Sequence, residues 1–153
     1  MSFVRRLKNV FTSTTASEPA DEQSGIVYAP EIDGEPDPGE VVWGWVPYED
    51  DPSQGKDRPV ILLAQGTGDQ AGSWLGLGLT SKDHDRDAEQ EASWGRYWMD
   101  VGSGGWDREG RPSEVRLDRL LVLAPADIRR EGAALDQAIF EAVVEAARQH
   151  HQL

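Results

Sequence analysis

Residues 38–64 read PGEVVWGWVPYEDDPSQGKDRPVILLA, and they decide the fold because they predict a strand, a long polar loop and a second strand. The segment 41–46 is β-branched or aromatic apart from one glycine and is flanked by prolines, which is typical of a half-buried strand. The loop 48–57 is rich in Asp, Pro, Ser and Gly. Arg58 precedes Pro59, which favours extended backbone and starts the apolar run 60–64. We therefore expect a cation where a polar loop enters a buried strand.

Further short apolar segments extend this pattern along the chain. They predict strands over residues 74–79, 97–101 and 115–123, with a charged loop over residues 82–91. A single helical turn is expected over residues 125–131, because it begins with proline and is followed by Gly132. Helical spacing of apolar residues then predicts an amphipathic helix over residues 137–148. Together these elements predict an α+β, mainly β, fold: a small barrel or coiled sheet packed by a C-terminal helix.

The first 37 residues are expected to form a leader, and residues 38–153 a single domain. Residues 1–11 hold three cations and no acid, which fits either a frayed terminus, the simpler interpretation, or a short amphipathic helix that touches a membrane, a partner or RNA. Residues 12–37 are polar and acidic, so we expect a flexible leader in which Ile26-Val27-Tyr28 docks on the domain.

Composition excludes several classes of protein. The 153 residues contain no cysteine, which excludes a disulfide scaffold and any thiol-based site. No apolar run reaches membrane-spanning length, so we expect a cytoplasmic protein. The net charge is −13, and residues 38–153 carry 21 acidic against 12 basic residues. Such a charge disfavours strong non-specific binding of nucleic acid, although a few cations that converge in one cleft can still bind RNA.

The order of motifs resembles the MazF/PemK (Kid) toxins, bacterial endoribonucleases of toxin–antitoxin modules. The similar elements are Gly39-Glu40-Val41-Val42-Trp43, then Gly55, then Arg58-Pro59-Val60. The resemblance continues through Leu79-Thr80-Ser81 and Val115-Arg116-Leu117-Asp118 and covers about residues 38–148. It implies an SH3-like barrel that forms homodimers and cuts single-stranded RNA by attack of the 2′-OH, without metal or cofactor. It also implies a cognate antitoxin that blocks the groove.

Arg58 is the first candidate catalytic residue. Its planar guanidinium suits phosphate oxygens and could stabilise charge that develops on them. The alternative is that Arg58 is a structural residue at the start of the strand and forms an ion pair with Asp57 or Asp50. The resemblance implies a catalytic arginine at this position.

Arg116 and Asp118 form the second candidate pair. Residues two apart in a strand point to the same face, so these side chains should lie side by side. The carboxylate could accept the 2′-OH proton while the cation stabilises the reacting phosphate. The alternative is an ordinary surface ion pair. The resemblance implies a catalytic Arg-x-Asp here.

Other candidates concern binding of the substrate. Thr80 is expected to contact a phosphate and to share in catalysis, as the resemblance implies, although a strand-end hydroxyl more often caps a turn. Ser81, Gly55 and Trp98 are expected to bind substrate. Four aromatic residues could stack unpaired bases, although strand spacing favours core packing for most of them: Trp94, Tyr97, Trp98 and Trp106.

Two observations weigh against parts of this interpretation. Asp83, His84, Asp85 and Asp87 could hold a metal ion, but their spacing fits no known pattern and a solvated loop is favoured. Asp51 stands where some family members have a histidine, and it would repel RNA. The alternative function is therefore a catalytically silent SH3-like module that binds protein or RNA.

Overall fold

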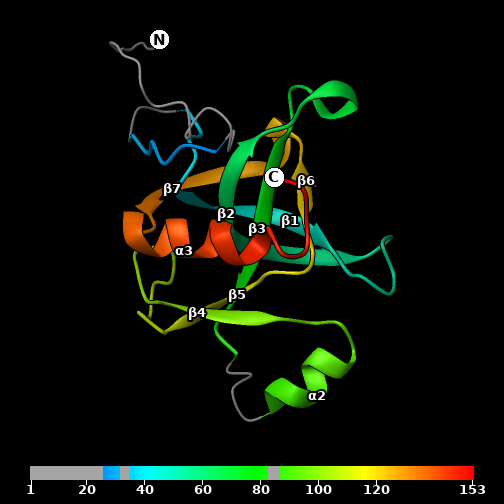
Figure 1. Cartoon of the computed structure of the whole chain (residues 1–153). Coiled ribbons are helices and arrows are strands. Elements are labelled where there is room, and N and C mark those ends of the chain that lie inside the picture. Colours follow the sequence, from blue (N-terminus) through cyan, green and yellow to red (C-terminus); the bar gives the residue numbers. More distant parts are fainter. Residues whose placement is uncertain (1–25, 32–34, 83–86) are drawn as a thin grey trace.

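The computed structural model describes residues 26–31, 35–82 and 87–153. Within these ranges the chain forms one curled antiparallel sheet in the order β4-β5-β3-β2-β1-β7, with β6 paired to β3 as well (Figure 1). The strands are β1 (Glu40–Pro47), β2 (Gly55–Gln65), β3 (Trp74–Thr80), β4 (Trp98–Gly102), β5 (Ser113–Arg116), β6 (Leu121–Leu123) and β7 (Ile128–Ala134). Helix α2 (Ala88–Ser93) follows β3, and helix α3 (Gln137–Ala147) follows β7. The expected mainly β fold with a C-terminal helix is confirmed.

The β1–β2 hairpin is the centre of the sheet. Its register runs from Val41 opposite Ile61 to Pro47 opposite Gly55. A side chain at Gly55 would collide with the carbonyl oxygen of Val46, so glycine is needed where the returning strand comes closest to β1. Gly55 therefore has a structural explanation that does not depend on substrate.

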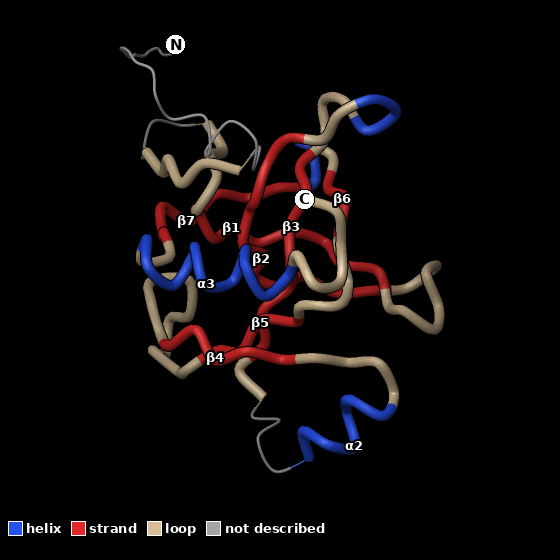
Figure 2. The backbone as a smooth tube through the Cα atoms, in the orientation of Figure 1, coloured by secondary structure: helices blue, strands red, loops and turns tan. Residues whose placement is uncertain are grey.

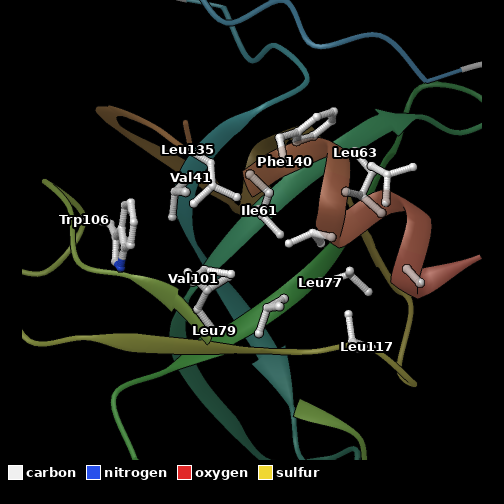
Figure 3. Packing of buried hydrophobic residues seen from close by; sticks show 14 residues of the cluster. Val41, Ile61, Leu63, Leu77, Leu79, Val101, Trp106, Leu117, Leu135 and Phe140 are labelled. Carbon is white, nitrogen blue, oxygen red and sulfur yellow. The ribbon is translucent and has the colours of Figure 1, made fainter. Parts of the chain in front are cut away.

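Both faces of β2 are buried, which explains its uninterrupted apolar run. Ile61 and Leu63 belong to the cluster covered by α3, which includes Phe140 (Figures 2 and 3). Val60 and Leu62 point the other way, into a second cluster that is closed by the curled sheet. The first cluster also contains Val41, Leu77, Leu79, Val101, Trp106, Val115, Leu117, Leu135, Val143, Val144 and Ala147. The sheet thus has one face under α3, whereas the other face carries the second cluster and, next to it, the site described below.

The strand expected over residues 115–123 is in fact two strands. β5 ends at Arg116 and β6 begins at Leu121, and the two pair with different parts of β3. Leu117 and Leu121 are four residues apart and would share one face of a straight strand, yet Leu117 packs in the cluster under α3 and Leu121 in the second cluster. The chain bends at this point, and the bend matters for the site below.

Two further expectations on secondary structure were wrong. The helical turn expected over residues 125–131 is limited to a 3₁₀ turn, Pro125–Asp127, because β7 then pairs with the open edge of β1. The loop expected over residues 82–91 ends in α2.

Part of the expected leader packs on the domain. The Tyr28 hydroxyl donates a hydrogen bond of 2.6 Å to the carbonyl of Leu135, and its ring lies 5.3 Å from that of Phe140. Ile26 contacts the same cluster. The packed structure therefore includes residues before position 38, while the expectation for residues 1–25 lies outside the described ranges. None of the described helices is long and apolar enough to cross a membrane.

Candidate active site

A cleft of about 580 Å³ brings four of the seven expected site residues together. Arg58, Thr80, Trp98 and Arg116 all line it. Ser81 lines a smaller neighbouring cavity of about 150 Å³, which Arg58 and Thr80 share. Gly55 lines neither of these two cavities, and Asp118 reaches the cleft only through its contact with Arg116.

Strand register explains why these residues meet. Val60 pairs with Gly78, and Arg58 and Thr80 each lie two residues beyond that pair, on the same face. Alternation along β2 places Arg58 on the side of Val60 and Leu62, away from α3. Gly78 also lines the cleft, and its missing side chain leaves the floor open.

The opposite wall comes from the β4–β5 pair. Trp98 lies directly across from Arg116 in the register of these strands. The Trp98 indole N–H donates to Glu91 at 3.0 Å, and Arg96 donates to the same carboxylate at 2.8 and 3.1 Å. Trp98 is thus held at the cleft wall by a partner from α2.

Arg116 is held by two carboxylates. Its Nε and Nη2 donate to Asp118, the latter at 2.7 Å, as the strand spacing predicts. Its Nη1 and Nη2 also donate to the two oxygens of Glu49, each at 3.0 Å. The side chains of Arg116 and Asp118 are only 14% and 12% exposed, whereas that of Glu49 is 55% exposed. A surface ion pair therefore does not describe Arg116 and Asp118.

These contacts shift the pKa values of the pair. Burial alone would raise the pKa of Asp118, but hydrogen bonds from Arg116 and from the Tyr97 N–H outweigh it and hold that pKa below its usual range. Burial opposes the charge of Arg116 too, yet its bonds to Asp118 and Glu49 raise its pKa. Both groups are therefore charged at neutral pH.

Arg58 has different surroundings. Among the described residues no carboxylate lies within ion-pair distance of its guanidinium, and Asp57 pairs with Arg129 at 3.0 Å instead. Burial and the charge of Arg119 lower the pKa of Arg58, although Tyr48 opposes this shift. The expected alternative, a pairing with Asp57, is not what the structure shows.

Several charged residues of the cleft were not expected from the sequence, and two of them, Arg119 and Glu49, make contacts that shape the site. Arg119 lines the cleft and donates a hydrogen bond of 2.7 Å from Nη2 to the carbonyl of Pro47. In a straight strand Arg116 and Arg119 would point to opposite faces, so only the bend after β5 brings them together. Glu49 lies in the β1–β2 loop, where the sequence carries no signal for its contact with Arg116.

The remaining aromatic candidates divide into core and surface. Trp106 is buried and donates its indole N–H to the Ser113 hydroxyl, so core packing explains it. Trp94 is 57% exposed, and Cζ of Arg96 lies 4.6 Å from its ring centre.

The acidic loop residues that were weighed as metal ligands, with a solvated loop favoured, fall mostly outside the described ranges, which omit residues 83–86. Among the residues that the structure does describe, no three or more potential ligands gather where they could hold a metal ion.

Comparison with known proteins identifies a family for most of the chain. The model of a family described as the PemK-like, MazF-like toxins of type II toxin–antitoxin systems matches residues 37–151, which include the described strands β1–β7, helices α2 and α3, and the cleft. No curated protein matches the chain.

Proposed function

The chain belongs to the PemK-like, MazF-like toxins of type II toxin–antitoxin systems, and from this we propose that it cuts single-stranded RNA in the cleft without a metal ion. The observation that carries the proposal is the convergence of Arg58, Thr80 and Arg116 on one cavity. Two cations and a hydroxyl are suitable partners for a phosphodiester and for the charge that builds on it during cleavage.

Arg58 and Thr80 would hold the reacting phosphate. Arg58 is half-buried and lacks a carboxylate partner among the described residues, so its N–H groups remain available for phosphate oxygens. The loss of one such preorganised donor typically costs about 3–4 kcal/mol of transition-state stabilisation. Ser81 borders the same region from the smaller cavity.

Two carboxylates could accept the 2′-OH proton, and access favours Glu49 over Asp118. Asp118 was expected to be the base, but it accepts hydrogen bonds from Arg116 and the Tyr97 N–H, and its pKa is lowered. Such a carboxylate is a weak and poorly accessible base. Glu49 also accepts from Arg116, at both oxygens, but it lines the cleft and is more than half exposed, so substrate can reach it. We therefore assign Asp118 the role of positioning Arg116, and Glu49 the role of base.

The proposed reaction follows from these roles. The ribose 2′-oxygen attacks the adjacent phosphorus as Glu49 takes its proton, and the bond to the 5′-oxygen breaks. The leaving oxygen takes a proton from water. The products are a 2′,3′-cyclic phosphate and a 5′-hydroxyl. Arg58 and Thr80 would stabilise the negative charge in between, and Arg116 would add its one remaining N–H group.

The partners follow from the family and from the surface. Membership implies a cognate antitoxin. We propose that the protein also forms a homodimer, because Trp45 and Val122 are large apolar side chains left about half exposed on β1 and β6. A monomeric mass at micromolar concentration would contradict the homodimer.

The proposal is tested by incubating the full chain with single-stranded RNA in EDTA. Cleavage by wild type and its loss in Glu49→Gln are the expected results, with Asp118→Asn retaining more activity than Glu49→Gln. Arg129→Ala is the matched control, because Arg129 is exposed and lines neither of the two cavities. If the folded protein binds RNA without cutting it under any condition, the catalytically silent binding module is the better description.

A further inference from the structure

The cleft contains two arginines that face the same space without acidic neutralisation. Neither Arg58 nor Arg119 forms an ion pair with any described residue, although both line the cleft. We infer that Arg119 is a phosphate-binding residue and that it and Arg58 together form a clamp for one backbone phosphate of the RNA. The inference rests on the proposed function and adds to it a residue that the family match does not assign.

A count of hydrogen-bond donors distinguishes this pair from Arg116. Arg116 has five N–H groups, and its contacts to Asp118 and Glu49 occupy Nε, both N–H groups of Nη2 and one of Nη1. Little donor capacity is left for a phosphate. Arg119 uses only Nη2, towards Pro47, and no hydrogen bond from Arg58 to a described residue is present. Among the arginines that line the cleft, Arg58 and Arg119 therefore have the most open donors, and Lys82, which carries an ammonium group, lines the same cleft.

Electrostatics points the same way. Two like charges that share a partly buried space repel each other, and the pKa of Arg58 is lowered by burial and by Arg119. A bound anion removes this repulsion and accepts hydrogen bonds from both planar groups. At about 580 Å³ the cleft has the size of ordinary small-ligand sites, enough for a phosphate together with part of a nucleotide.

The hydrogen bond to the carbonyl of Pro47 fixes the position of the Arg119 guanidinium. Pro47 is the last residue of β1, so the bond from Arg119 anchors the guanidinium beside the β1–β2 loop. The competing explanation is that Arg119 has a purely structural role and only links the β5–β6 bend to β1. Arg119→Gln separates the two, since an amide N–H₂ can still donate to Pro47 but carries no charge.

The experiment measures binding of an all-2′-deoxy oligonucleotide, which cannot be cut by 2′-OH attack, and of inorganic phosphate. Wild type, Arg119→Gln, Arg119→Lys and the control Arg129→Ala are compared over a range of salt concentrations. We expect Arg119→Gln to weaken oligonucleotide binding about tenfold at low salt and to reduce the salt slope by about 0.7, the value for one phosphate contact on a single strand. We expect Arg119→Lys to keep the slope, and Arg129→Ala to match wild type.

Several results would overturn the clamp. They are an unchanged affinity and slope in Arg119→Gln, an equal loss in the Gln and Lys variants, or no binding by wild type at low salt. Equal loss would assign the effect to the contact with Pro47. Thermal midpoints of all variants establish that they are folded. A wild type that binds the oligonucleotide through Arg119 but cuts no RNA would refute the nuclease and leave the clamp intact.

Discussion

The two sides of the cleft use arginine in opposite ways. On the β5 side, Arg116 is held by Asp118 and Glu49, so its position is fixed and its charge is more than balanced. On the other side, Arg58 of β2 and Arg119 of the β5–β6 bend share one cavity, and no described carboxylate pairs with either. The difference shows that a residue type alone does not define its role. The balanced arginine can orient a base, whereas the unbalanced pair can bind an anion.

The largest effect is expected from removing the unbalanced charge of Arg58. Arg58→Ala should lower the rate of RNA cleavage about a hundredfold or more, because one preorganised donor to the phosphate is lost. The thermal midpoint should not fall, since no ion pair is broken. Rates at saturating RNA together with thermal unfolding check both points. An active Arg58→Ala variant would break the distinction between the two sides.

Arg116→Ala should differ by also destabilising the fold. It leaves the largely buried Asp118 without its cationic partner, which typically costs about 3 kcal/mol or more. Cleavage should fall as well, because Glu49 loses its anchor. Denaturant unfolding measures the stability, with Arg129→Ala as the control that stays within about 0.5 kcal/mol of wild type. If the Arg58→Ala and Arg116→Ala variants have the same free energy of unfolding, the proposed difference between an arginine with carboxylate partners and one without them is contradicted.

The pH dependence of stability sharpens the contrast further. The pKa of Asp118 is lower in the folded chain than the usual 3.8. The carboxylate therefore stabilises the fold above that value and loses this contribution as the pH falls through its lowered pKa. Asp118→Asn should cost about 1–2 kcal/mol at pH 7, and the difference from wild type should vanish in strong acid. Unfolding curves at several pH values check this. A difference that persists below pH 2 would show that the ion pair is not its source.

The smallest effect concerns salt. Because the net charge is −13, moderate salt or polyamine should first raise cleavage, as it screens the repulsion of RNA, and then lower it as contacts to phosphate weaken. A change of a few-fold is expected. Rates of RNA cleavage measured between low and moderate ionic strength check this prediction. A rate that falls steadily from the lowest salt concentration would show that attraction of RNA by the cleft cations outweighs repulsion by the net charge.

The parts of the molecule set by local pattern could be predicted from sequence. The β1–β2 hairpin and the α3 helix follow from periodicity, and the spacing of Arg116 and Asp118 predicts their contact. β7 could not be predicted in this way, because its place depends on the open edge of β1 and not on its own pattern. The resemblance to a family supplied the roles of Arg58 and Thr80, which residue type alone leaves open.

The missed parts of the site depend on tertiary geometry. Arg119 reaches the cleft only because the chain bends between β5 and β6, and the period-2 pattern of one continuous strand hides that bend. Glu49 reaches Arg116 across 67 positions in the sequence, from a loop with many acids, and nothing local distinguishes it from Asp50 or Asp51. Contacts of this kind follow from the fold, and they decide which of the two carboxylates bound to Arg116 is exposed to the cleft and which is buried.

The most direct test of the central claim is the chemistry of the cut RNA ends. The full chain is incubated with single-stranded RNA in EDTA, and the ends are identified for wild type and for Arg58→Ala. We predict 2′,3′-cyclic phosphate and 5′-hydroxyl ends from wild type, and at most about a hundredth of that product from the variant. Absence of cleavage, dependence on a divalent metal, or ends with 3′-hydroxyl and 5′-phosphate would contradict the proposed reaction.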